Sequence, residues 1–164
     1  MSPVTETQIG AIGESLVSTQ LMLESNGRLS PFHPMADDTG IDLLIYDKKT
    51  GHSIPVQVKA RTKTLTRHPK ILHFQVRKAT FKEEQHAFLL AVYIDTKDNN
   101  WVIGRAWLIP MRELQNVTGE RADRLVLRPS IDIRSKDKYS KYRCKDMLEV
   151  INKMIADCEE RGLI

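Results

Sequence analysis

The apolar run at residues 87–94 is the feature that most constrains the fold of this chain. It reads Ala-Phe-Leu-Leu-Ala-Val-Tyr-Ile and contains no charged residue. A short run so rich in strand-forming residues is typical of a β-strand that is buried on both faces. Such a strand needs a covering layer on each side, so the sequence predicts a central sheet flanked by other elements.

Other patterns predict the elements around this strand. Thr5 and Gln8 have capping-box spacing, and apolar residues then recur at helical intervals until a stop at Asn26 and Gly27. The stretch with Pro31 and Pro34 is expected to be irregular. Strands are predicted at 41–46, 54–60, 72–77, 101–109 and 125–127, and further helices at 78–85, 110–114 and 142–161.

This order of elements predicts an α/β (α+β) fold, with a central mixed sheet flanked by helices. The core order is αβββαβ, followed by extra C-terminal strands and a helix. The length of 164 residues fits one domain spanning 1–164. The composition, 41% hydrophobic and 28% charged, is that of an average globular chain and excludes a disordered one.

No apolar run approaches the roughly 20 residues that cross a bilayer, and residues 1–8 lack the features of a signal peptide. We therefore expect a cytoplasmic protein without a membrane partner. Cys144 and Cys158 lie in a stretch that looks helical, without metal-ligand spacing, and are expected to be buried reduced thiols. The net charge of +4 permits an anionic partner such as nucleic acid without requiring one.

Three polar side chains are predicted to meet where two strands pair. Alternate side chains of a strand share a face, so Gln57 and Lys59 point together, away from Val58. If strands 41–46 and 54–60 form a hairpin around Lys49 and Thr50, Asp42 falls opposite the segment from Gln57 to Lys59.

Glu14 is a fourth candidate for this site. In the first helix it lies beside Val17 and Leu21, at the margin of the apolar face, from which a carboxylate can reach the sheet. A carboxylate turned towards a half-buried site needs a cation or several donors, because an isolated buried charge is costly.

These residues carry a family resemblance. Gly13-Glu14-Ser15-Leu16-Val17, Gly40-Ile41-Asp42 and Gln57-Val58-Lys59 resemble, in order and spacing, the three motifs of the PD-(D/E)XK nuclease superfamily, whose fold is restriction-endonuclease-like. The resemblance covers about residues 9–94. It is closest to the Gln-x-Lys branches, which include Mrr-like restriction endonucleases and small uncharacterised nuclease-like domains.

The resemblance implies a role for each motif residue. Asp42 and Glu14 would bind Mg²⁺ or Mn²⁺, with the backbone carbonyl of Val58 as a further ligand, and Lys59 would be the catalytic lysine. Gln57 departs from the commonest pattern, since an amide carries no negative charge and should bind the cation less tightly than an acid.

Two basic segments bear on the partner. Arg61, Lys63, Arg67 and Lys70 follow the motif strand directly and are the better candidates for phosphate contacts. In the second segment basic residues alternate with tyrosines, and its simplest interpretation is a solvated face. Its residues are Lys136, Lys138, Tyr139, Lys141, Tyr142, Arg143 and Lys145. Asp37 and Asp38 are expected to be part of a turn, and the alternative is that they are extra metal ligands. No catalytic role follows for His33, His68, His73 or His86.

Two functions remain open from the sequence. The first is a metal-dependent endonuclease that hydrolyses DNA, for which a homodimer with two symmetric sites would suit the cutting of both strands. The second is a catalytically inactive nuclease-like domain that binds nucleic acid or a protein partner. Considered without the other motif residues, Asp42 and Lys59 are most simply a cross-strand ion pair. The feature that discriminates the two functions is whether Glu14, Asp42 and Lys59 converge within reach of one metal ion.

Overall fold

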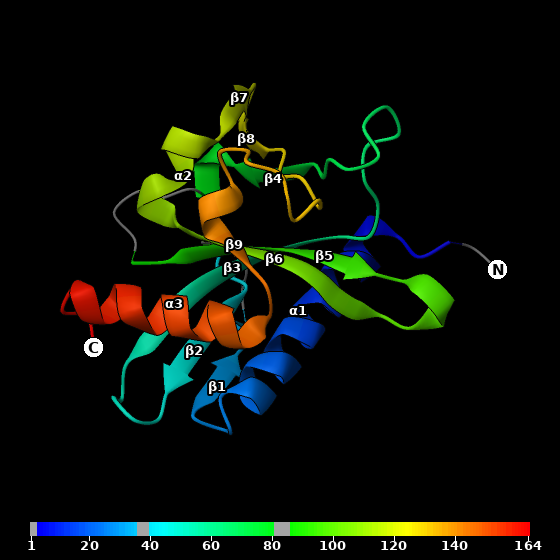
Figure 1. The fold of residues 1–164 in the computed structure, drawn as a ribbon. Coiled ribbons are helices and arrows are strands. Elements are labelled where there is room, and N and C mark those ends of the chain that lie inside the picture. Colours follow the sequence, from blue (N-terminus) through cyan, green and yellow to red (C-terminus); the bar gives the residue numbers. More distant parts are fainter. Residues whose placement is uncertain (1–2, 36–39, 81–85) are drawn as a thin grey trace.

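The apolar run forms the middle of a mixed sheet in the computed structural model, which describes residues 3–35, 40–80 and 86–164 (Figure 1). The helices are α1 (Glu6–Glu24), α2 (Met111–Val117) and α3 (Met147–Glu160). The strands are β1 (Leu29–Phe32), β2 (Leu43–Asp47), β3 (Ser53–Arg61), β4 (Phe74–Arg77), β5 (Phe88–Asp95), β6 (Val102–Pro110), β7 (Gly119–Arg121), β8 (Arg124–Leu127) and β9 (Arg143–Cys144).

In the described part of the chain the strands form two sheets. The central sheet has the order β1-β2-β3-β5-β6-β9, and the smaller sheet has the order β4-β8-β7. β3 and β5 are parallel, whereas the other neighbours in both sheets are antiparallel. β5 is therefore hydrogen-bonded on both edges, as a strand buried in the middle of a sheet should be.

The two faces of the central sheet are covered by different layers, which Figure 1 shows below and above the sheet. One face carries Val56, Val58 and Ala60 of β3 and packs against α1 and α3. The other face carries Leu89, Ala91 and Trp107 and packs against the small sheet and α2: Phe74, Val76, Leu125, Leu127, Leu114. The small sheet thus stands over the same face of β3 that presents Gln57 and Lys59.

The first helix begins and ends where the sequence predicts. The Thr5 hydroxyl accepts a hydrogen bond from the backbone N–H of Gln8, and the Gln8 side chain accepts one from the backbone of Thr5, so the capping box is complete. Beyond Glu24, Asn26 and Gly27 adopt positive φ values of 50° and 75°, which ends the helix.

The predicted irregular stretch at Pro31 is partly wrong, because residues 29–32 form β1. Within the described sheet β1 is an edge strand whose partner is β2, with Pro31 opposite Ile45. An edge position tolerates proline, since its missing N–H can face away from the ladder. Arg28 just before β1 fixes this edge by donating to both carboxylate oxygens of buried Asp47, at 2.8 and 2.6 Å.

Two predicted helices differ from the structure. The predicted helix at 78–85 is a single 3₁₀ turn at Lys78–Thr80 in its described part, and residues 81–85 lie outside the described residues. The predicted helix at 142–161 begins later, at Met147, because the Asp146 carboxylate accepts a hydrogen bond from the Glu149 N–H and caps it. Cys144 therefore lies in β9 and not in a helix, although it and Cys158 are both buried free thiols as predicted.

The other predicted strands and the helix after Pro110 are confirmed with small shifts of their bounds, but β4 joins the small sheet and not the central one. Among the described residues, no helix is long and apolar enough to span a membrane.

Candidate active site

An open edge of β3 lies at the centre of the site. β2 accompanies β3 only as far as the pair Leu43 and Val56, so beyond this point the β2 side of β3 has no strand partner in the described chain. Asp42 closes the ladder with its own backbone, donating from its N–H to the Val56 carbonyl at 3.1 Å. The next N–H of β3 along this edge, that of Val58, donates instead to the Asp42 carboxylate at 2.6 Å.

This contact confirms the predicted position of Asp42 opposite the segment from Gln57 to Lys59. Gly40, two residues earlier, is buried with a φ of 71°, a left-handed conformation that suits glycine and bends the chain into β2. In a strand the N–H and C=O of one residue point to the same edge. The Val58 carbonyl therefore faces the side from which Asp42 approaches.

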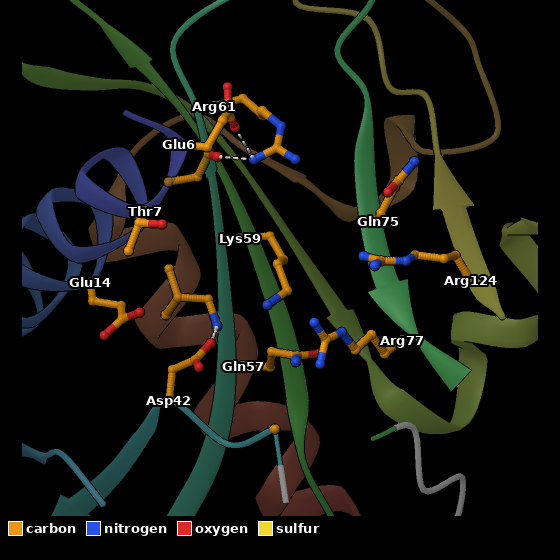
Figure 2. Close-up of a pocket in the computed structure, with 14 residues that line it drawn as sticks. Glu6, Thr7, Glu14, Asp42, Gln57, Lys59, Arg61, Gln75, Arg77 and Arg124 are labelled. Atoms are coloured by element: carbon orange, nitrogen blue, oxygen red, sulfur yellow. Dashed lines mark hydrogen bonds and ion pairs between the residues drawn. The ribbon is translucent and has the colours of Figure 1, made fainter. Parts of the chain in front are cut away.

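Gln57 and Lys59 share the opposite face of the strand from Val58, as predicted. Gln57 is only 3% exposed, and its side-chain oxygen Oε1 is buried without a hydrogen-bond partner among the described residues. Leaving a buried polar oxygen unsatisfied costs about 1–3 kcal/mol, so such an atom marks a place where a donor or a cation fits. Lys59 is half-buried beside it (Figure 2).

Glu14 reaches the site because α1 packs unusually close to β3. A Cβ added at Gly13 would lie 2.4 Å from the Ala60 Cβ, a distance that only glycine permits. Glu14 follows directly and is half-buried, with 31% of its side chain exposed. Its carboxylate lies 3.8 Å from His33 Nδ1, which makes His33 a neighbour of the site that the sequence pattern did not indicate.

The small sheet supplies a wall that was not predicted. Gln75 and Arg77 of β4 and Arg124 of β8 extend towards β3 from the side opposite α1 (Figure 2). Alternation in 74–77 does put Gln75 and Arg77 on a polar face, but nothing local tells which sheet that face lines. Arg124 lies one residue before the predicted strand.

These side chains line one pocket of about 540 Å³ between α1 and the small sheet (Figure 2). All four predicted catalytic residues and Val58 are on its wall, and the complete set is Glu6, Thr7, Gly10, Glu14, Gly40, Asp42, Gln57, Val58, Lys59, Ala60, Arg61, Gln75, Arg77 and Arg124. Glu14 and Asp42 approach from one side of β3, and Gln57 and Lys59 from the other (Figure 2). The structure therefore brings the predicted set together across the open edge of the strand.

The basic residues predicted to contact phosphates separate into two groups. Arg61 lines the pocket, where it pairs with Glu6 at 3.0 Å and donates to the carbonyls of Ala60 and His73. Lys63, Arg67 and Lys70 are exposed on the connection after β3 and do not line the pocket. Lys70 instead pairs with Asp132 at 2.9 Å, which holds the pKa of that carboxyl well below its usual range.

The second basic segment is largely engaged in internal contacts. Tyr142 donates to the Glu113 carboxylate at 2.7 Å, and this hydrogen bond is the main reason that the pKa of Glu113 is lowered. Lys141 also binds Glu113, and Arg143 donates to two backbone carbonyls of the preceding loop. The lysines of this segment are exposed, as expected of a solvated face, whereas Tyr139 and Tyr142 are buried, which that expectation did not include.

The donors at the pocket fit a hard divalent cation through oxygen only. Among the described residues, no three His, Cys, Asp or Glu side chains gather as ligands for a metal ion. A cation here would instead combine the carboxylates of Asp42 and Glu14 with neutral oxygens, those of the Val58 carbonyl and the unsatisfied Gln57 Oε1. Asp37 and Asp38, the candidate extra ligands, lie outside the described residues.

Comparisons with known proteins bear on the fold. No protein-family model and no curated protein match the chain in sequence. In structure, the chain is similar to a bacterial homing endonuclease, I-Ssp6803I, with a TM-score of 0.60 at 13% identity over 96% of this chain and 98% of that one. This likeness confirms the predicted fold class: the chain has a nuclease-like fold in which a central mixed sheet is flanked by helices.

Proposed function

We propose that the protein is a metal-dependent endonuclease that hydrolyses phosphodiester bonds in DNA, and that it is a Gln-x-Lys member of the PD-(D/E)XK superfamily. The observation that carries this proposal is the hydrogen bond from the Val58 N–H to the Asp42 carboxylate at the open edge of β3. It sets Asp42 into the wall of the pocket that Glu14, Gln57 and Lys59 also line.

Each side chain has a task in this proposal. Asp42 and Glu14 hold the metal from one side of β3, together with the Val58 carbonyl, while the Gln57 amide oxygen adds a neutral donor. Mg²⁺ or Mn²⁺ bound there would supply Lewis acidity towards a phosphodiester oxygen and the attacking water. The absence of a third carboxylate predicts weaker cation binding than in a site with an acid at position 57.

Lys59 acts on the reacting phosphate itself. Its ammonium lies in the pocket between the carboxylates and the arginine-bearing small sheet (Figure 2). From there it can orient the attacking water by hydrogen bonding and offset the negative charge that develops on the phosphate oxygens. A compact ammonium with three donors suits this task.

The structural likeness supports DNA as the substrate. I-Ssp6803I is a homing endonuclease, and the structural match covers nearly all of both chains. The pocket adds an electrostatic reason, because four basic residues line it against three acidic ones.

The proposal is tested by incubating the protein with duplex, single-stranded and branched DNA in Mg²⁺, Mn²⁺ or EDTA. Asp42→Asn keeps an acceptor for the Val58 N–H but loses the charge, and Lys59→Ala removes the ammonium. We expect each to lower the cleavage rate at least about a hundredfold. Asp98→Asn and Lys49→Ala, at exposed positions outside the pocket, are the matched controls and should cleave like the wild type.

Cleavage that survives EDTA, or that Asp42→Asn leaves intact, would overturn the mechanism. DNA binding without any product from the wild type would favour the alternative, a nuclease-like domain that only binds. With a supercoiled plasmid the same assay examines the expected homodimer, since two coupled sites release linear product without an accumulating nicked form.

A further inference from the structure

The wall that the small sheet contributes to the pocket is basic. Arg77 of β4 and Arg124 of β8 line the pocket and extend towards the β3 strand that carries Gln57 and Lys59 (Figure 2). The other face of the same two strands is buried against the central sheet through Phe74, Val76 and Leu125. The pair Arg77 and Arg124, called here the arginine pair, is therefore held on a packed support.

The register of the small sheet crowds like charges together. Arg77 is the direct cross-strand partner of Arg124, and Arg121 of β7 is the partner of Arg124 on the other side. Like charges directly opposite one another destabilise a sheet. The acids of the β7–β8 hairpin compensate Arg124 little: Asp123 lies 3.7 Å away but is 76% exposed, and Glu120 is bound by Lys78 at 2.6 Å. A phosphate between these strands and β3 would therefore meet two guanidinium groups that come from neighbouring strands.

The charges of the pocket are also divided in space. Two of its three acids, Glu14 and Asp42, come from the α1 and β2 side, whereas the arginine pair comes from the opposite side, with Lys59 between them (Figure 2). Glu6 and Arg61 neutralise each other at the end of the pocket. A phosphodiester suits both walls, because its oxygens accept hydrogen bonds from guanidinium groups and also bind a metal ion. Guanidinium groups suit phosphate oxygens because they donate two parallel hydrogen bonds.

We propose that the arginine pair is a phosphate-binding site that clamps the nucleic-acid backbone against β3, on the side of the reacting phosphate away from Asp42 and Glu14. The inference rests on the proposed function, which it deepens by naming the residues that hold the substrate. Because the arginines contact phosphate and not base edges, this clamp is indifferent to sequence.

The test measures binding without cleavage. A fluorescent duplex DNA is titrated in EDTA at several salt concentrations with the wild type and with the double variant Arg77→Gln/Arg124→Gln. Removing one phosphate-binding cation lowers the slope of log K against log salt by about 0.9, so the double variant should show a slope reduced by roughly 1.8. Arg77→Lys/Arg124→Lys should restore most of the slope, because it keeps the charge.

The control is Lys48→Gln/Lys49→Gln, which removes the same charge from the turn between β2 and β3, outside the pocket. It should shift the slope much less than the arginine variant. If the double arginine variant fails to fold by circular dichroism, the single variant Arg124→Gln replaces it, with half the expected change.

The outcomes separate the two proposals. A reduced slope in a protein that never cleaves upholds the clamp and removes the nuclease activity. Metal-dependent cleavage with an unchanged slope in the arginine variant, or equal reductions in the arginine and lysine variants, overturns the clamp alone. A wild type that binds no DNA in any salt also overturns the clamp.

Discussion

In the proposed metal site, Gln57 is the residue whose chemistry would decide how tightly a cation is held. Its Oε1 is buried in the pocket wall without a hydrogen-bond partner among the described residues. Gln57→Glu places a negative charge there, and one unit charge about 4 Å from another is worth roughly 4 kcal/mol at an effective dielectric constant near 20, before the cost of burying it. We expect Mn²⁺ to bind at least about tenfold more tightly, as measured by calorimetric titration.

The same substitution should destabilise the metal-free protein, because a carboxylate at a position only 3% exposed lacks a cation. Mn²⁺ should then raise the melting temperature of Gln57→Glu more than that of the wild type. Gln75→Glu adds the same charge to the opposite wall and serves as the control. Equal Mn²⁺ affinity in the wild type and Gln57→Glu would show that the amide oxygen does not face the metal.

Asp47 is a second residue with a measurable effect, on stability and not on catalysis. Hydrogen bonds from Arg28, and then from the Lys49 N–H and the Thr50 hydroxyl, hold the pKa of this buried carboxyl down to about 2. A pKa lowered from near 4 in the unfolded chain stabilises the folded state above pH 4 by about 2 kcal/mol.

The lowered pKa of Asp47 sets the pH window of this contribution. It is complete above the unfolded pKa and is lost as pH falls through the folded pKa, so Asp47→Asn should cost about 2 kcal/mol at pH 7 and progressively less between pH 4 and pH 2. Denaturant unfolding across this range measures the difference, with exposed Asp98→Asn as the control. A deficit that stays constant with pH would contradict the assignment.

At the scale of elements, the close approach of α1 to β3 positions Glu14. An alanine Cβ at Gly13 would meet the Ala60 Cβ at 2.4 Å, and neither atom belongs to a flexible side chain. Gly13→Ala should therefore destabilise the protein by about 1–3 kcal/mol and move Glu14 away from the pocket. Gly10→Ala, in the same helix with nothing within 4 Å of the added Cβ, should instead stabilise by up to about 1 kcal/mol.

A double variant isolates the contact between the two elements. Ala60→Gly removes the Cβ with which the alanine at position 13 collides. The double variant should therefore lose less stability than the sum of the losses in the two single variants, as measured by thermal or denaturant unfolding. Additive effects of the two substitutions would mean that the helix does not press on the strand at this point.

At the scale of the whole molecule, the pocket exists because two layers meet over one strand. β3 lies between α1, which brings Glu6 and Glu14, and the small sheet, which brings two arginines (Figure 2). The strand itself belongs to the central sheet, whose two faces are filled by separate apolar clusters. Substitutions of apolar residues in either cluster should consequently change stability, whereas those of Asp42 and Lys59 should change mainly the cleavage rate.

Patterns among neighbouring residues were enough to predict the first helix, the central strand and the meeting of four residues that line the pocket. The capping box at Thr5 and the apolar run of β5 are local patterns, and the short turn after Asp47 sets the register of the hairpin that places Asp42 opposite the β3 segment. Gln57, Lys59 and the margin position of Glu14 follow from the periods of strand and helix.

The remaining wall of the pocket depends on tertiary pairing and could not be predicted in this way. β4 pairs with β8 across nearly fifty residues of chain, and Arg77 meets Arg124 only through that pairing. The local alternation of a strand specifies its two faces but not its partner, because long-range pairing depends on which apolar surfaces are left to be covered. For the same reason β1 was not predicted, because Pro31 is typical of irregular structure. The proline is tolerated because the strand lies at the edge of the described sheet.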